Sequence, residues 1–182
     1  MSRKYKFADN DKLYFISFAV VFWIDLFIRN EYREIMLESW RFCQKEKGLE
    51  IYGWCIMTNH VHMIVGSKDR AMDKIVGEMK SFTSRSLRKQ IVENPRESRR
   101  VWMSEMMKRA GIENSNNNDW QLWQQHNKPI EIFNKKMFNQ KLEYIHLNPV
   151  KAGFVENPED YLYSSARDFC GKKGLIELSY IV

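Results

Sequence analysis

The sequence contains few cysteines. Its 182 residues include three, Cys43, Cys55 and Cys170, and these show neither close pairing nor C-x-x-C spacing. Disulfide frameworks and zinc ribbons both depend on cysteine pairs, so this scarcity argues against either. We therefore expect a protein of a reducing compartment, the cytoplasm.

Long hydrophobic runs and targeting segments are also missing. The most apolar stretch, residues 13–28, is short for a membrane span and contains Ser17 and Asp25. No cationic segment with a small-residue cleavage site surrounds it. We expect no membrane partner, and we interpret the first part of this stretch as a buried strand.

Internal repeats are absent, and compositional bias is confined to one short segment. Residues 113–119 are rich in asparagine, and their polarity predicts a surface loop. The chain is 44% hydrophobic, which is enough for one sizeable core. We therefore predict a single domain over residues 1–182.

Histidine is scarce as well, but two of the four histidines lie two residues apart. His60 and His62 are in an apolar run, and on a β-strand alternate residues point to the same face. Both imidazoles would then project side by side toward one divalent metal ion. A plain surface pair remains the alternative, because a short motif also occurs without a ligand.

A helix is predicted over residues 129–148, which start at a proline and end just before Pro149. Tyr144 and Asn148 are four residues apart and share one helical face, on which Lys141 also lies. A tyrosine on a helix is more often a core residue than a nucleophile. Only its combination with the histidine pair favours a catalytic role.

Apolar spacing predicts strands alternating with helices. The order β-α-β-β-α-β with an added helix suits an α+β sandwich of ferredoxin-like type. Its antiparallel sheet would carry helices on one face, and the additional C-terminal helix would lie across the end of the sheet. The expected strands are 12–22, 50–57, 60–66 and 120–125, and the expected helices are 31–47, 70–92 and 130–148.

Several motifs occur in a characteristic order along the chain: residues 53–62, 80–83, 144–153 and the Tyr-Ser-Ser-Ala segment 163–166. Together they resemble the single-tyrosine HUH transposases of insertion sequences, and in particular the REP-associated tyrosine transposase branch, which has the ferredoxin-like fold. The resemblance runs from about residue 14 to residue 169. Residues 94–118 depart from it and are interpreted as an inserted surface loop, and residues 150–182 as a C-terminal extension.

The resemblance implies cleavage and rejoining of single-stranded DNA, with a hairpin substrate in the manner of that branch. Tyr144 would be the nucleophile and would form a 5′-phosphotyrosine intermediate. His60, His62 and Asn148 would hold a divalent metal ion, Mg²⁺ or Mn²⁺, that polarises the scissile phosphate. Asn148 stands where the family often has glutamine, and two imidazoles favour manganese over magnesium.

Charge is consistent with a nucleic-acid partner. The net charge is +6 and the isoelectric point is about 9.2, so the protein should be attracted to polyanions. Trp120 and Trp123 either stack on unpaired bases or fill core positions on a strand. An ordinary solvated helix face is the alternative for the basic residues. The basic residues predicted to contact DNA phosphates are Lys80, Arg85, Arg88, Lys89 and Lys141. Arg96, Arg99 and Arg100 follow the first four along the chain and extend this basic stretch.

Two functions of different classes remain open. The first is a metal-dependent DNA transposase, and the second is a domesticated binder of structured single-stranded nucleic acid that no longer cuts. The histidine pair and Tyr144 favour the enzyme, since a pure binder needs none of them. The C-terminal extension favours a monomer over a homodimer, and His146, facing away from Tyr144, is expected to have a structural role.

Overall fold

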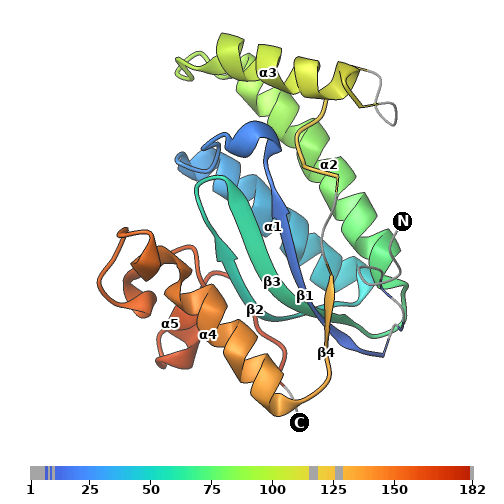
Figure 1. The fold of residues 1–182 in the computed structure, drawn as a ribbon, viewed down its shortest axis with the longest axis vertical. Helices are drawn as coiled ribbons and strands as arrows, with labels where there is room; N and C mark the ends of the chain where they lie inside the picture. The colour runs from blue at the N-terminus through green and yellow to red at the C-terminus, as the bar shows by residue number, and fades with distance from the viewer. Residues whose placement is uncertain (1–6, 8, 10, 115–118, 126–128, 181–182) are drawn as a thin grey trace.

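The structure, a computed structural model, describes residues 7, 9, 11–114, 119–125 and 129–180. Its centre is a four-stranded antiparallel sheet in the order β2-β3-β1-β4 (Figure 1). The strands are β1 (Leu13–Ala19), β2 (Leu49–Ile56), β3 (His60–Ser67) and β4 (Ile130–Ile132). This order, with helices between the strands, confirms the predicted α+β fold of ferredoxin-like type.

Helices cover both faces of the sheet. The long helices α1 (Asn30–Lys47) and α2 (Met72–Glu93) pack against each other on one face (Figure 1). The additional helix α4 (Lys135–Lys151) packs against β2 and β3 on the opposite face, rather than across the end of the sheet as expected.

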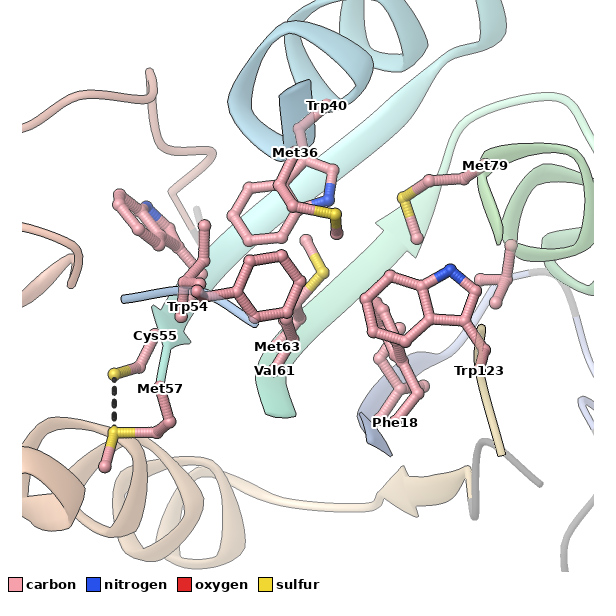
Figure 2. Close-up of a cluster of buried hydrophobic side chains, with 14 of the residues drawn as sticks. Phe18, Met36, Trp40, Trp54, Cys55, Met57, Val61, Met63, Met79 and Trp123 are labelled. Atoms are coloured by element: carbon pink, nitrogen blue, oxygen red, sulfur yellow. Dashed lines mark hydrogen bonds between the residues drawn. The ribbon is translucent and has the colours of Figure 1, made fainter. Parts of the chain in front are cut away.

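Helix α1 forms because its buried residues recur at helical spacing. Met36, Trp40 and Cys43 lie on one side of it, and it ends at Gly48, whose φ of 67° is a left-handed conformation that glycine adopts freely. Trp40 packs edge-on against Trp54 of β2 in the core between this helix and the sheet, with ring centroids 5.4 Å apart (Figure 2).

Strand β3 divides its side chains between the two faces of the sheet. Val61 and Met63 are fully buried in the core below α1 and α2 (Figure 2). Because alternate residues of a strand point to opposite faces, His60 and His62 face the side where α4 packs. The two imidazoles therefore lie on one face of the sheet, as their two-residue spacing predicted.

Two of the predicted elements differ from the structure. The expected strand at 120–125 contributes only an isolated bridge between Val20 and Trp123, and the edge strand is β4, whose Ile132 pairs with Leu13 of β1. The first residues of the predicted last helix are thus a strand, since apolar periodicity does not distinguish such short segments.

Helix α4 begins later and ends later than predicted. The side chain of Asn134 accepts a hydrogen bond from the backbone N–H of Met137 and caps the start of the helix. Pro149 lies inside the last turn rather than just past the end, and the helix continues to Lys151. A proline there removes only one backbone hydrogen bond, so the last turn persists.

The C-terminal extension covers the β2 edge of the sheet. After α4 come η3 (Pro158–Asp160) and α5 (Ala166–Phe169). The segment between η3 and α5 bonds to β2. The N–H of Ile56 donates to the carbonyl of Tyr163, and the N–H of Ser165 donates to the carbonyl of Trp54. Farther along, the N–H of Ser179 donates to the carbonyl of Ile51. An edge paired in this way is closed to a strand of another chain.

The segment 94–118, predicted to be a surface loop, contains a helix. Helix α3 (Arg100–Ile112) packs against α2, while residues 115–118 of the predicted polar loop lie outside the described residues. Before α3, the buried carboxylate of Glu97 pairs with Arg29 at 2.8 Å and with Arg99 at 3.0 Å, and accepts a hydrogen bond from the Tyr32 hydroxyl. This ion cluster ties the segment to the start of α1.

None of the helices among the described residues is long and apolar enough to cross a membrane.

Candidate active site

The two histidines of β3 lie side by side at the start of the strand. Their ring centroids are 4.7 Å apart and their planes are inclined by 75°. The strand backbone alone produces this proximity, because residues two apart share one face. The apolar residues that alternate with them anchor the strand in the core.

His62 is buried but makes no hydrogen bond. It is 5% exposed, its ring stacks on Phe15 with centroids 5.6 Å apart, and neither Nδ1 nor Nε2 has a partner. Burial, followed by the charges of His60 and Lys141, lowers the pKa of His62 to about 3, so the imidazole is neutral. A neutral imidazole nitrogen is a common metal ligand. Buried polar atoms rarely remain without a partner, so the free ring nitrogens of His62 are suited to bind a ligand.

His60 is oriented by its neighbour. The Asn59 amide nitrogen donates to the Asp25 carboxylate at 3.0 Å and to the carbonyl of Trp23 at 3.3 Å. Its amide oxygen is then the acceptor for His60 Nδ1–H, 2.6 Å away. The lone pair of the neutral imidazole is therefore on Nε2. Burial lowers the pKa of His60, with Asp25 opposing the shift.

Tyr144 of α4 is the third member of the group. Its ring centroid lies 5.1 Å from that of His62 and 5.9 Å from that of Phe15, and the side chain is 43% exposed. Lys141, one turn earlier, places its ammonium 5.0 Å from the Phe15 ring centroid. Asn148, one turn later, is half-buried. The three predicted residues His60, His62 and Tyr144 thus meet, with Lys141 beside them.

Close packing sets the position of α4 over the sheet. A Cβ atom at Gly53 of β2 would lie 2.6 Å from Leu142 Cδ1, so any larger residue there requires the Leu142 side chain to shift. His146 lies 2.8 Å from the Ser165 hydroxyl, which also bonds with the N–H and carbonyl of Trp54. The predicted structural role of His146 is confirmed, because it links α4 to β2 through the Tyr-Ser-Ser-Ala segment.

The predicted metal ligands are neutral side chains. Among the residues that the structure describes, no group of three His, Cys, Asp or Glu side chains could hold a metal ion. A site at His60 and His62 would need an oxygen from another residue type, and the amide of Asn148 is of that type.

The other basic residues predicted to contact DNA lie elsewhere. Lys80, Arg85, Arg88 and Lys89 are on α2, across the sheet from Tyr144, and the first three line a groove of about 340 Å³ with residues 119–123. Lys80 donates to the carbonyl of Gln124 at 3.0 Å, and burial lowers its pKa to about 8. Arg88 pairs with Asp119 at 2.9 Å. Arg85 donates to the Ser81 hydroxyl, and Lys89 is exposed.

The two tryptophans considered for base stacking are core residues. Trp123 packs between Phe18 and Phe27, and its indole N–H donates to the Thr83 hydroxyl at 3.1 Å. Trp120 is 9% exposed, with the Arg88 guanidinium over its ring. The core interpretation of this pair is therefore confirmed, although the segment is not a strand.

Sequence reasoning missed the residues that support the histidines. Asn59 directly precedes His60, and its amide was a local signal for a partner of the imidazole. Asp25 and Phe15 are far from the histidines in sequence, and no spacing pattern relates them. Ser165 lay within a recognised motif, but its bond with His146 depends on how the chain folds back.

Comparisons with known proteins relate both the sequence and the fold to tyrosine transposases. Residues 24–110 match the model of a family described as IS200-like transposases, Y1_Tnp, a span that includes His60 and His62 and ends before Tyr144. Over 100% of this chain and 94% of the other, the structure is similar to that of a REP-associated tyrosine transposase bound to a REP hairpin, with a TM-score of 0.66 and 17% identity. A comparison with curated protein sequences gave no match. The resemblance to IS200-like and REP-associated tyrosine transposases is thus confirmed.

Proposed function

We propose that this protein is a metal-dependent transesterase of single-stranded DNA that acts as a transposase. The observation that carries the proposal is the position of Tyr144, half-exposed and 5.1 Å from a buried His62 whose ring nitrogens have no partner. Such an arrangement offers a nucleophile beside vacant ligand atoms. A core packing role for Tyr144 would instead favour burial of its ring.

The reaction balances without an external energy source. The Tyr144 oxygen attacks a backbone phosphorus, a phosphotyrosine bond forms, and the bond to the 3′ oxygen breaks. The phenol proton leaves Tyr144 and a proton is gained by the departing 3′-hydroxyl. A later 3′-hydroxyl reverses the step, because the phosphotyrosine bond retains the energy of the phosphodiester.

The donor set fits a divalent cation, Mg²⁺ or Mn²⁺. His60 would present Nε2, because Asn59 occupies Nδ1–H, and His62 would present an otherwise unpartnered nitrogen. Asn148 would add an amide oxygen from the helix turn after Tyr144. When bound, the ion supplies Lewis-acid stabilisation of charge on the scissile phosphate. Two imidazoles favour Mn²⁺, whereas Mg²⁺ prefers oxygen ligands.

Lys141 is the basic residue that we assign to this site. Its charge contributes to the lowered pKa of His62, and its ammonium lies beside Phe15, which touches Tyr144. A cation there stabilises the tyrosine phenolate or the incoming phosphate. Lys80, Arg85, Arg88 and Lys89 would contact phosphates farther along the strand, on the opposite face of the sheet.

A DNA hairpin with unpaired flanks is the proposed substrate. The structural neighbour was bound to a REP hairpin, and a net charge of +6 favours a polyanion. We propose a monomer, because the extension already occupies the edge of β2. The three free cysteines support a reducing cytoplasmic location.

The test is a search for covalent adducts on denaturing gels. Labelled single-stranded hairpins with Mn²⁺ or Mg²⁺ should give a metal-dependent adduct with the unaltered protein. Tyr144→Phe and His62→Ala should lose it, while Tyr180→Phe, a change at a tyrosine 76% exposed, should keep it. An adduct that survives Tyr144→Phe would refute the assignment.

The second candidate is a binder that does not cut. It is favoured if hairpins bind tightly but no adduct forms with any metal ion, across a pool that varies the unpaired flanks.

A further inference from the structure

The turn between β1 and α1 has an unusual backbone. In η2 (Val21–Trp23) two successive residues other than glycine have positive φ, 54° at Phe22 and 55° at Trp23. A left-handed conformation brings Cβ close to the following carbonyl oxygen, and bulky residues seldom adopt it. Within the described chain, Phe22 and Trp23 are the residues other than glycine that have positive φ, so this turn is strained.

Burial of the two aromatic rings does not offset the cost of this strain, because both rings are largely exposed. Phe22 is 44% exposed and Trp23 is 58% exposed. Large apolar rings usually gain stability by leaving water, which these rings do only in part. Strain without burial is characteristic of functional positions, where the surroundings hold the conformation in place.

Neighbouring hydrogen bonds hold the turn beside the candidate active site. The carbonyl of Trp23 accepts from the Asn59 amide, the same side chain that orients His60. The Trp23 ring lies edge-on to the His60 ring, with centroids 5.8 Å apart. Asn59 therefore joins an exposed indole to one of the proposed metal ligands.

A cation borders the same turn. Helix α3 contacts η2, and its Arg109 places the guanidinium 6.0 Å from the Phe22 ring centroid. Arg109 also pairs with Glu113, an exposed contact that competes little with a polyanion. The surface beside His60 thus combines two exposed aromatic rings with a guanidinium.

We propose that Trp23 is a stacking platform for an unpaired nucleobase next to the scissile phosphate. This inference rests on the proposed function, because the phosphate would lie at His60, whose ring touches the indole. Stacking suits an exposed indole, since every base has a π-face, and Arg109 supplies the positive charge that the backbone needs. Phe22, the residue before Trp23, is also exposed.

The experiment compares two ligands of equal charge. One is a short oligothymidylate, and the other is a chain of the same length made of abasic deoxyribose phosphates. Phosphate contacts are the same for both, so the ratio of their dissociation constants isolates the contribution of the bases. Binding is measured without a metal ion, which removes cleavage from the assay.

The unaltered protein should prefer the oligothymidylate by about 5-fold to 150-fold, the range expected for stacking of one base. Trp23→Ala should reduce this preference to near unity, and Trp23→Phe should retain most of it. Phe42→Ala, at an aromatic ring 56% exposed on α1, should leave it unchanged. A preference that persists in Trp23→Ala, or that is absent from the unaltered protein, would overturn the inference.

The outcome is separable from that of the proposed function. If the preference is lost in Trp23→Ala while no adduct ever forms, the platform stands and the cleavage proposal fails. If Tyr144 forms adducts but the preference is unaffected in Trp23→Ala, the platform fails and the cleavage proposal stands. Thermal unfolding of Trp23→Ala and Trp23→Phe checks that both remain folded.

Discussion

The ring of Tyr144 stands edge-on to the ring of His62, with centroids 5.1 Å apart and planes inclined by 72°. The tyrosine belongs to α4 and the histidine to β3, so this contact depends on how the helix sits on the sheet. Leu142 of that helix packs directly over Gly53 of β2, where an added Cβ would lie 2.6 Å from Leu142 Cδ1.

Gly53→Ala should therefore disturb the site without touching a proposed ligand. The new methyl group would push the tip of the Leu142 side chain aside and loosen its packing under α4, at a cost of about 1 kcal/mol in the free energy of unfolding. Adduct formation by Tyr144 should slow as well. Urea unfolding and the adduct assay measure the two effects.

Gly77→Ala is the matched control for that change. Apart from the neighbouring backbone of its own helix, no atom lies within 4 Å of a Cβ at Gly77, which is in α2. Alanine in a helix interior should increase stability by about 0.5–1 kcal/mol and leave adduct formation unchanged. Equal effects of the two substitutions would contradict the role given to the Gly53 contact.

Asn59→Ala should weaken metal binding. Without the amide oxygen, Nδ1–H of His60 loses its acceptor and the imidazole is free to turn Nε2 away. Losing such an outer partner typically lowers metal affinity by about 10-fold to 100-fold. Titration with Mn²⁺, followed by electron paramagnetic resonance, gives the affinity independently of activity. Asn139→Ala, at an exposed asparagine of α4, should have no effect.

Backbone strain at Trp23 predicts that glycine at this position gives a more stable protein than alanine, the reverse of their order in a helix. Both substitutions remove the ring, but only glycine adopts a φ of 55° without strain. The free energy of unfolding of the Trp23→Gly variant should be higher than that of the Trp23→Ala variant by about 0.5–1 kcal/mol. At Phe42, inside α1, alanine should be the more stable by a similar amount. If alanine is favoured at both positions, the turn is not strained.

Glu97 predicts how stability changes in acid. Burial acts to raise the pKa of Glu97, but hydrogen bonds and charge from Arg99 outweigh it and lower the pKa from 4.5 to about 2. The unfolded state therefore takes up the proton first as the pH falls. The contribution of Glu97 is complete above about pH 4.5 and is lost toward pH 2.

Glu97→Gln isolates this contribution. At pH 7 the substitution should lower the free energy of unfolding by about 3 kcal/mol, because Arg29 and Arg99 lose a buried partner. At pH 3 the difference from the unaltered protein should be smaller. Urea unfolding at the two pH values gives both numbers, and a difference that does not depend on pH would contradict the assigned ion cluster.

Light scattering of the full chain should give the mass of a monomer across a range of concentrations. Tyr163, Ser165 and Ser179 already make backbone hydrogen bonds with β2, so that edge is not available to a second copy. A dimer mass would show that another surface associates.

Much of the candidate site was predictable because it depends on the short side-chain repeats of a strand and a helix. A strand places His60 beside His62 whatever the rest of the chain does, and a helix places Asn148 one turn after Tyr144. The motif order also predicted the fold. The last strand was misplaced because Ile130 and Ile132 fit a helix pattern as well as a strand, and local spacing does not choose between them.

Sequence by itself thus determined the two halves of the site: an imidazole pair on a strand and a tyrosine on a helix. Tertiary structure decided that the halves meet, through contacts such as that of Leu142 with Gly53 and that of Ser165 with His146. It also decided which side chains reach solvent, leaving Trp23 exposed and Trp123 buried. Such outcomes depend on contacts between residues far apart in the chain, whose energies have no counterpart in sequence spacing.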